Sequence, residues 1–330
     1  MNSLNYIDLF CGVGGFSSGF DDEGFKNIFS LDNNSVFCQT YKENFPNHKL
    51  IEKNIEDITK NEINELIANK QIDVIIGGPP CQGFSIAGNI GRKFLNDPRN
   101  NLFLEFARLV SVVKPKIIVI ENVQRLDIHN KGNTKEEIFN KFQSLGYKIK
   151  SQVLNSVDYG VPQKRRRIIF IGSKMNSKIR FPPPLKKPYI TVKEAISKYP
   201  KLSSGEKSLI PNHVAMNHTE QMLTKMSFVK DGQGRETIPT QIRPKSGDVR
   251  KYIRYDSKKP SITITGDMRK VFHYSQNRAL TVRELASLQS FKDDFTFKGS
   301  TISQQQQVGN AVPPLLARSI AKQIKKMLNE

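Results

Sequence analysis

The stretch Asp8-Leu9-Phe10-Cys11-Gly12-Val13-Gly14-Gly15-Phe16 decides the fold, because it ends an apolar strand in a run of glycines and then starts a helix. Glycine lets the backbone adopt positive φ and approach a ligand closely. The run is not a dinucleotide fingerprint, since Ser17 stands where the third glycine would be, and it lacks the Lys-Ser/Thr of a P-loop. Both differences favour a nucleoside ligand without phosphates. The glycines alone leave open a second interpretation, a structural corner that binds nothing.

Four more apolar runs of strand length follow, each stopped by turn-forming or polar residues: 27–31, 73–76, 116–120 and 167–171. Amphipathic stretches that suit helices, such as 62–69 and 102–113, lie between them. This alternation predicts a parallel, doubly wound α/β sheet, in which ligands bind at the carboxyl ends of the strands. Asp32 follows the second run, where such folds carry an acid that binds the ribose hydroxyls.

The second half of the chain has a different character. Prolines at 182–184 break the pattern, and the residues from there to about 277 are irregular and rich in Pro, Gly, Ser and Lys. Order resumes at 280–291, and an amphipathic helix at 314–328 closes the chain. We therefore predict a large domain of residues 1–181 and 300–330, a smaller irregular domain of residues 182–277, and a connecting segment of residues 278–299.

The charge of the chain indicates a polyanionic partner. Its 330 residues include 51 Lys and Arg but only 31 Asp and Glu, a formal net charge of +20. Such a balance favours nucleic acid. Residues 225–270 hold twelve basic and five acidic side chains, which makes them the best candidate for a nucleic-acid face. A solvated basic surface would have the same composition.

Other classes of protein are excluded by what the sequence lacks. The three cysteines form no CxxC pair, which excludes a disulfide scaffold and a zinc ribbon. No apolar stretch approaches the ~20 residues that cross a bilayer. The first residues lack the basic start and the apolar core of a signal peptide. We expect a cytoplasmic protein with no membrane partner and no metal site. His213 and His218 are expected at the surface or facing DNA.

Cys81 is the candidate nucleophile. The strand at 73–76 runs into Gly77-Gly78-Pro79-Pro80, so two prolines fix the backbone just before this cysteine, and the glycine-containing residues after it suit a lid. A free cysteine is most often a small buried hydrophobe, which is the interpretation for Cys11 and Cys38. The two prolines before Cys81 and the glycine-containing residues after it favour a nucleophilic thiolate at this position.

Two other strands have charged residues at their ends. Glu121 and Asn122 follow the strand at 116–120, and Arg165 and Arg167 lie at the start of the strand at 167–171. The two arginines share one face of an extended segment. A thiol, a carboxylic acid and guanidinium groups at neighbouring strand ends suit covalent catalysis on an electron-poor ring.

Together these residues resemble the bacterial cytosine-5 DNA methyltransferases of type II restriction–modification systems. The resemblance runs from the first strand to the last helix and rests on six blocks in the family's order and spacing. They are Phe-x-Gly-x-Gly-Gly at 10–15, Pro80-Cys81-Gln82, Glu121-Asn122-Val123, Gln163-x-Arg165-x-Arg167, Arg278-Ala-Leu-Thr-Val-Arg-Glu284 and Gln307-Val-Gly-Asn-Ala-Val-Pro-Pro314. The resemblance implies an S-adenosylmethionine-dependent, Rossmann-like α/β fold, in which residues 182–277 form the target-recognition domain.

The resemblance also implies a reaction on a cytosine that is flipped out of duplex DNA. Cys81 would attack carbon 6 and form a covalent adduct, while Glu121 would bond or protonate ring nitrogen 3. Carbon 5 would then take the methyl group and lose its proton as Cys81 is released. Arg165 would brace the base and the acid, with Arg167 in a supporting role.

Binding residues follow from the same resemblance. Those for S-adenosylmethionine, and for its product S-adenosylhomocysteine, are Phe10, Gly12, Val13, Asp32, Asn33, Asp57, Ile58, Pro80, Leu102 and Asn310. Asp32 would hold the ribose and Asp57 the adenine amine, and Asn310 implies that the C-terminal helix folds back onto the first domain. Ser85, Gln233 and Thr263 would contact DNA. Gln233 would fill the hole left by the flipped base, although its Gly-Gln-Gly setting also suits a plain turn.

Other hypotheses stand beside this one. A cytosine-5 methyltransferase of structured RNA is opposed by the recognition region of roughly 90 residues, which related RNA enzymes lack. A second alternative, an orphan regulatory DNA methyltransferase, is also compatible with the sequence. A third, a DNA-binding protein that has lost its catalytic activity, is opposed by the presence of Cys81, Glu121 and Arg165. The resemblance implies duplex DNA as partner, a cognate restriction endonuclease without a stable complex, a monomer, and association with the bacterial nucleoid.

Overall fold

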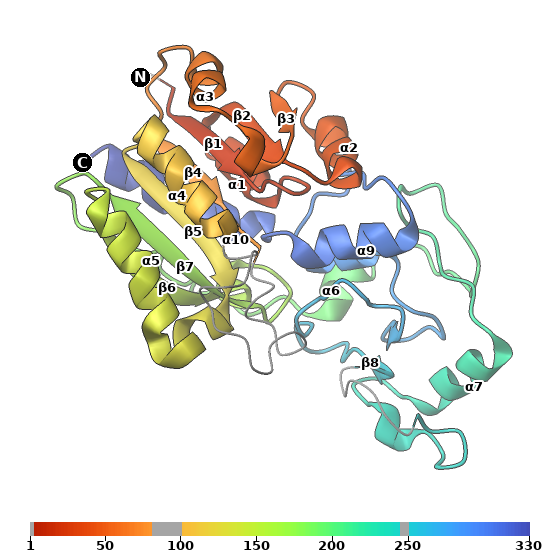
Figure 1. Ribbon diagram of the computed structural model, residues 1–330. Coiled ribbons are helices and arrows are strands. Elements are labelled where there is room, and N and C mark those ends of the chain that lie inside the picture. The colour runs from red at the N-terminus through yellow and green to blue at the C-terminus, as the bar shows by residue number, and fades with distance from the viewer. Residues whose placement is uncertain (1–2, 81–100, 245–250) are drawn as a thin grey trace. The chain divides into compact units, whose positions relative to one another are not determined.

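The computed structural model describes residues 3–80, 101–244 and 251–330 (Figure 1). The chain divides into two compact units: Met1–Asn155 with Arg166–Pro184 and Pro314–Glu330, and Ser156–Arg165 with Leu185–Pro313. The break after Pro184 lies at the end of the proline run, close to the boundary expected at residue 181. Residues 156–165 and 300–313, in contrast, belong to the second unit by their contacts and not to the unit that holds the sheet.

The first unit is built on a seven-stranded sheet with the order β3-β2-β1-β4-β5-β7-β6. Its strands are β1 (Asn5–Leu9), β2 (Lys26–Asp32), β3 (Leu50–Glu52), β4 (Val74–Gly77), β5 (Ile117–Val123), β6 (Lys148–Asn155) and β7 (Arg166–Ser173). Strands β1 to β5 pair in parallel, which confirms the doubly wound α/β fold. The strand order reverses direction at β1, between β2 and β4, and ligands of such sheets bind beside this point.

The sheet is not parallel throughout, so that part of the expectation is wrong. β7 runs antiparallel to both β5 and β6. The link from β6 to β7, Ser156–Arg165, is too short for the helical crossover that a parallel pair needs. β6 was not expected as a strand at all. It lies at the edge of the sheet and mixes exposed and buried residues, so it has no continuous apolar run.

Helices cover both faces of the sheet (Figure 1). They are α1 (Gly15–Asp22), α2 (Ser35–Asn44), α3 (Lys60–Ile67), α4 (Asn101–Val113), α5 (Asn133–Ser144) and α10 (Pro314–Leu328), with the 3-10 helices η1 (Ile55–Asp57) and η5 (Gln124–Gly132). On one face, Phe106 of α4 and Phe142 of α5 pack with Ile118 of the sheet in one core. On the other, α10 packs so closely on α1 that a side chain at Gly19 would overlap the backbone at Arg318.

The second unit is irregular, as its composition predicts. It holds η6 (Ser156–Tyr159), α6 (Val192–Ile196), α7 (Glu220–Phe228), η7 (Arg235–Thr237), α8 (Val282–Leu288), α9 (Thr301–Asn310) and the short paired strands β8 (Ile253–Arg254) and β9 (Val271–Phe272). A buried ion pair lies inside this unit. Arg278 donates from Nη1 and Nη2 to the two carboxylate oxygens of Glu284, at 2.8 and 2.6 Å, and both side chains are buried.

The expected surface position of His213 is wrong. Its ring is fully buried, with Nδ1 2.9 Å from Oγ1 of Thr281 and Nε2 3.0 Å from the carbonyl oxygen of Pro200. His218 is half-buried, and its Nε2 accepts a hydrogen bond of 3.0 Å from the backbone N–H of Ala279. Both rings therefore serve internal hydrogen bonding. Over the described ranges, no helix is long and apolar enough to span a membrane, and no three metal-binding side chains form a cluster.

Candidate active site

The loop between β1 and α1 has the backbone shape that its glycines predict. Phe10, Gly12 and Gly14 have φ values of 59°, 54° and 91°. A side chain at Gly14 would overlap the ring of Phe45, whereas a Cβ at Gly12 would meet no described atom within 4 Å. Gly14 is therefore required for packing. Gly12 borders open space, in which a ligand can approach the backbone.

Asp32, at the end of β2, is fixed against this loop. Its Oδ2 accepts a 2.8 Å hydrogen bond from the backbone N–H of Gly12, and its Oδ1 accepts one of 2.9 Å from the N–H of Asn34. Burial raises the pKa of Asp32, while the N–H donors at residues 34 and 12 act in the opposite direction. The carboxylate thus has a defined orientation at the edge where β1 and β2 end.

A chain of side-chain hydrogen bonds continues from this edge. Asn33 Nδ2 donates to Asn54 Oδ1 at 2.8 Å, and Asn54 Nδ2 donates to Asp57 Oδ2 at 3.1 Å. Ile58, the next residue, is buried in the core. The structure therefore brings together the predicted cofactor residues of three separate segments, namely the glycine loop, the end of β2 and η1. Asn54 was not predicted, because it joins two site residues without belonging to a sequence block.

The other predicted cofactor residues lie elsewhere. Val13 is buried in the glycine loop, Pro80 is exposed after β4, and Leu102 is half-buried near the start of α4. Asn310 is the exposed last residue of α9, in the second unit.

Glu121 lies beside the segment that leads to residue 81. A Cβ built at Gly78 would be 3.4 Å from Glu121 Oε2. The amide of Asn122 donates to the carbonyl of Pro79 at 3.3 Å, so the end of β5 is hydrogen-bonded to the first of the two prolines. Cys81 and Ser85 themselves lie outside the described residues.

Arg167 pairs with this acid. Its Nε is 2.9 Å from Glu121 Oε1, and the two side chains are 15% and 11% exposed. The pairing of β5 with β7 explains the contact, because Arg167 is opposite Val123, two residues from Glu121 on the same face. The structure thus joins two of the predicted catalytic residues directly.

Arg165 belongs to the second unit and is almost fully buried. Its Nη1 donates to the carbonyl of Ile264 at 3.2 Å. Thr263, the predicted DNA contact, donates from its hydroxyl to the carbonyl of Lys164 at 2.9 Å. The segments around residues 163 and 263 are therefore hydrogen-bonded side by side.

Gln163 holds these two segments together. Its Oε1 accepts a 2.9 Å hydrogen bond from the N–H of Ile264, and its Nε2 donates to the side chain of Gln289. The side chain is fully buried. Sequence reasoning placed Gln163 in a block with the arginines but gave it no role.

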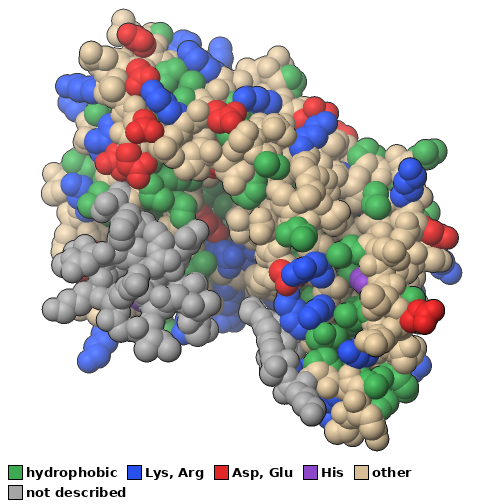
Figure 2. Space-filling model, turned by 45° about the vertical axis from the view of Figure 1, so that its right-hand side comes forward, with side chains coloured by type: hydrophobic (Ala, Val, Ile, Leu, Met, Phe, Trp, Pro, Cys, Tyr) green, Lys and Arg blue, Asp and Glu red, His purple; other side chains and the backbone are tan. Residues whose placement is uncertain are grey.

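Gln233 lies on a turn. It is exposed, follows Gly232 with φ 75°, and its backbone carbonyl accepts a 2.9 Å hydrogen bond from the N–H of Arg254. Its side-chain Oε1 accepts from the N–H of Lys230 at 3.1 Å. The turn therefore presents Gln233 to solvent on a supported backbone. Figure 2 shows Lys and Arg side chains spread over the face in view, in its upper as well as its lower half.

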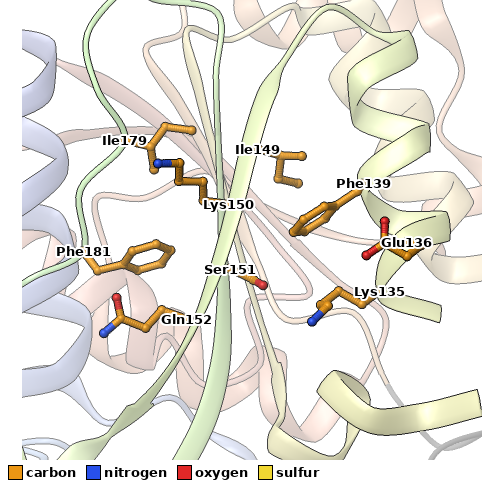
Figure 3. A pocket seen from close by; sticks show the side chains of 9 residues that line it. All are labelled: Lys135, Glu136, Phe139, Ile149, Lys150, Ser151, Gln152, Ile179 and Phe181. Carbon is orange, nitrogen blue, oxygen red and sulfur yellow. The ribbon is translucent and has the colours of Figure 1, made fainter. Parts of the chain in front are cut away.

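A separate pocket of about 590 Å³ lies in the first unit, around the edge strand β6 (Figure 3). It is lined by Lys135, Glu136, Phe139, Ile149, Lys150, Ser151, Gln152, Ile179 and Phe181. None of the predicted catalytic or binding residues lines it.

Comparison with known proteins identifies the family. The family model for "C-5 cytosine-specific DNA methylase" matches residues 4–326. The chain belongs to this family of DNA methylases. It is 58% identical over 325 residues to the type II methyltransferase M1.HphI of Haemophilus parahaemolyticus, covering 98% of this chain and 87% of that one. It is also 36% identical to the type II methyltransferase M.DdeI of Desulfomicrobium norvegicum, covering 97% of this chain and 88% of that one.

A solved structure supports the same family. The methylase superposes with a TM-score of 0.82 and 27% identity on a crystal structure from E. coli, described as a DNA modification methyltransferase encoded within a prophage. The match covers 99% of this chain and all of the other. The resemblance drawn from the six blocks is thereby confirmed, as is the methyltransferase fold.

Proposed function

We propose that this methylase transfers a methyl group from S-adenosylmethionine to carbon 5 of a flipped-out cytosine in a specific duplex DNA sequence, through a covalent bond to Cys81. One observation carries the proposal. Glu121, oriented by Arg167, lies against Gly78 on the segment that ends in Cys81. An acid next to the approach of a thiol suits attack on a pyrimidine ring, because the charge that develops on the ring needs a proton or a hydrogen bond.

Each residue has a separate task in this mechanism. The Cys81 thiolate forms a bond to carbon 6. Glu121, in its protonated form, donates a hydrogen bond or a proton to nitrogen 3, so the electron pair reaches carbon 5. Carbon 5 would take the methyl group that the cofactor supplies and would then lose its proton to solvent. The bond between sulfur and carbon 6 then breaks to restore the thiolate, and nitrogen 3 returns its proton to Glu121. Arg167 keeps the carboxyl group of Glu121 oriented. Arg165, from the second unit, would contact the base.

The described residues fit the cofactor, which would supply an electrophilic methyl group. Asp32 is placed to accept hydrogen bonds from ribose hydroxyls at the carboxyl end of β2, and Gly12 borders open space beside it. Asn33, Asp57 and Ile58 belong to the same cluster, in which Asp57 would accept from the adenine amine. Phe10, Val13, Pro80, Leu102 and Asn310 complete the proposed binding set.

The second unit, centred on residues 182–277, would carry target recognition. Gln233 and Thr263 would contact DNA there, together with Ser85 of the first unit's chain segment. The net charge of +20 supports phosphate contacts and a steep salt dependence of DNA affinity. Because its relatives are type II methyltransferases, we further propose that a cognate restriction endonuclease recognises the same site, and that the methylase acts as a monomer.

Trapping the covalent intermediate tests the reaction. Duplex DNA with 5-fluorocytosine at the target should form a stable adduct with the wild-type protein, located at Cys81 by peptide mass spectrometry. Cys81→Ser should form no adduct and no 5-methylcytosine, whereas Cys38→Ala, which removes a buried thiol of α2, should still be trapped. An adduct at another residue, or full activity of Cys81→Ser, would overturn the nucleophile assignment.

Two further measurements define the substrate. Tritium transfer from S-adenosylmethionine to duplex DNA and to tRNA should favour DNA, and preference for tRNA would support the RNA alternative. Bisulfite sequencing of DNA from expressing cells then gives the recognition sequence and the methylated cytosine.

A further inference from the structure

A buried chain of hydrogen bonds runs beside the glycine loop, entirely within the first unit. Ser17 Oγ of α1 is 2.7 Å from Asp8 Oδ2 of β1 and 2.8 Å from Tyr41 Oη of α2. Tyr41 Oη is 2.9 Å from His48 Nδ1, and His48 Nε2 is 3.1 Å from Asp21 Oδ2. The chain thus connects a fully buried carboxyl group, through two hydroxyls and an imidazole, with a carboxylate that is 32% exposed.

Two observations relate this chain to the cofactor loop. The ring of Tyr41 would be 3.0 Å from a Cβ at Gly14, so it packs directly against the loop. Asp8 is 1% exposed, and its Oδ1 has no hydrogen-bond partner among the described residues. A buried carboxyl oxygen without a partner is costly when it is charged. Among the described residues, the groups that shift the pKa of Asp8 include no cation.

The hydroxyl of Tyr41 has three hydrogen-bonding neighbours, which is the largest number of hydrogen bonds that it can form. It has one proton and two acceptor sites, and its third neighbour is Ser30 Oγ at 2.7 Å. When Asp8 is ionised, Ser17 donates to Asp8, and Tyr41 must donate to Ser17. His48 then has to donate from Nδ1 to Tyr41, and it also needs a proton on Nε2 to face the carboxylate of Asp21. This first arrangement contains a charged Asp8 and an imidazolium.

The chain has a second complete arrangement. When Asp8 is protonated, it donates to Ser17, which donates to Tyr41, which donates to an unprotonated Nδ1 of His48. The remaining ring proton, on Nε2, then faces Asp21. Ser30 donates to Tyr41 in both arrangements. The two differ only in the direction of the hydrogen bonds and in the place of one proton, which is on Asp8 or on His48.

We propose that Tyr41 is a positioning residue that lets Asp8 become charged when a cationic cofactor binds, by passing the proton of Asp8 to His48. This rests on the proposed function, since S-adenosylmethionine carries a sulfonium cation that S-adenosylhomocysteine lacks. The cation stabilises the arrangement with a charged Asp8, and the neutral product does not. The chain therefore favours binding of the substrate over its product.

The surroundings of Asp8 agree with this. Burial raises its pKa to about 8, with smaller contributions in the same direction from Asp32 and Asp21, while the Ser17 hydroxyl acts in the opposite direction. The other titratable groups that interact with Asp8 are Tyr6, Cys11 and Tyr41. All these groups are acidic or neutral, so none of these described neighbours gives Asp8 a positive charge, and a cation in the loop would do so.

The ring nitrogens of His48 give the readout. The full-length protein is labelled with ¹⁵N-histidine, and His48→Gln assigns the signal. At pH 7.5, we expect imidazolium shifts for His48 with saturating S-adenosylmethionine and a neutral ring with S-adenosylhomocysteine. Tyr41→Phe should abolish the difference. Ser30→Ala, which also removes one hydrogen bond from Tyr41 but leaves the path intact, should preserve it.

Calorimetry provides the second measurement. The ratio of affinities for S-adenosylmethionine and S-adenosylhomocysteine should fall about fivefold or more in Tyr41→Phe and stay unchanged in Ser30→Ala. Ser17→Ala interrupts the same path and should act like Tyr41→Phe, so the test does not depend on one variant folding. Identical His48 signals in the two complexes, or an equal loss in Ser30→Ala, would overturn the proposal. Failure of the wild type to bind S-adenosylmethionine would instead overturn the proposed function.

Discussion

Arg167 and Glu121 form an ion pair across two antiparallel strands, with Nε and Oε1 2.9 Å apart. The pair fixes the acid next to Gly78, three residues before Cys81. From the sequence, bracing of the acid was assigned to Arg165 with support from Arg167. Within the first unit, it is Arg167 that contacts the acid.

Arg167→Gln should therefore lower kcat by about 10- to 100-fold, because Glu121 loses the partner that orients it. Single-turnover methyl transfer to duplex DNA measures the effect. Arg166→Gln is the matched control, since Arg166 is exposed and its side chain points to the other face of β7. Equal rates for the wild type and Arg167→Gln would contradict the role given to the ion pair.

Gly12 and Gly14 should respond differently to alanine. Gly14→Ala should lower the free energy of unfolding by ~2–4 kcal/mol, because the methyl group adds overlap with Phe45 to the strain of positive φ. Gly12→Ala should cost only about 1 kcal/mol but weaken S-adenosylmethionine binding at least tenfold, since its methyl group would occupy the space that a ligand needs. Denaturant unfolding and calorimetry separate the two effects. Equal destabilisation by both substitutions would contradict the interpretation that Gly12 borders open space and Gly14 does not.

The buried pair of Arg278 and Glu284 should behave as one unit. Glu284→Gln should destabilise the second unit by about 3–5 kcal/mol, because it leaves the guanidinium buried without a counter-charge. The double variant Arg278→Met/Glu284→Gln should lose less than the sum of the losses in the single variants Arg278→Met and Glu284→Gln. Denaturant unfolding of all four proteins completes the cycle, and strict additivity would argue against a coupled pair.

Acid should destabilise the protein partly through His273. Burial lowers the pKa of His273 to about 4, although Glu284 acts in the opposite direction. Between pH 4 and the unfolded value of about 6.5, the unfolded chain binds the extra proton, so stability is complete above this window and is lost as the pH falls through it.

His273→Asn, which keeps an acceptor for the N–H of Ser275, should weaken this dependence. The difference in unfolding free energy between pH 7 and pH 4.5 should shrink by up to about 3 kcal/mol. His129→Asn in the first unit is the control, because its ring is only partly buried. A pH dependence unchanged in His273→Asn would assign the acid sensitivity to other groups.

The sequence predicted strands and helices correctly where apolar residues followed a clear pattern. The apolar runs gave β1, β2, β4, β5 and β7, and the 3.6-residue pattern gave α10 with both ends correct. Edge strand β6 could not be found in this way, because only one of its faces is buried, and periodicity does not tell an antiparallel β7 from a parallel one.

The residues of the site could be predicted where they belong to sequence motifs, but the side chains that hydrogen-bond to them could not. Asp32, Asn33 and Asp57 could be named, yet Asn54, which connects two of them, depends on a turn that no pattern encodes. His213 and Gln163 were missed for a related reason. A polar side chain carries no mark of being buried until its hydrogen-bond partners, which are distant in sequence, are known.

The close packing of Gly19 on Arg318 has a consequence for folding. The two residues belong to one unit, yet the whole of Leu185–Pro313, which belongs to the other unit, lies between them in the sequence. The contact between α1 and α10 therefore closes a very long loop, and contacts between residues so distant in sequence form slowly. The half that holds the glycine loop should thus gain its cover of α10 only after the local contacts of each unit have formed.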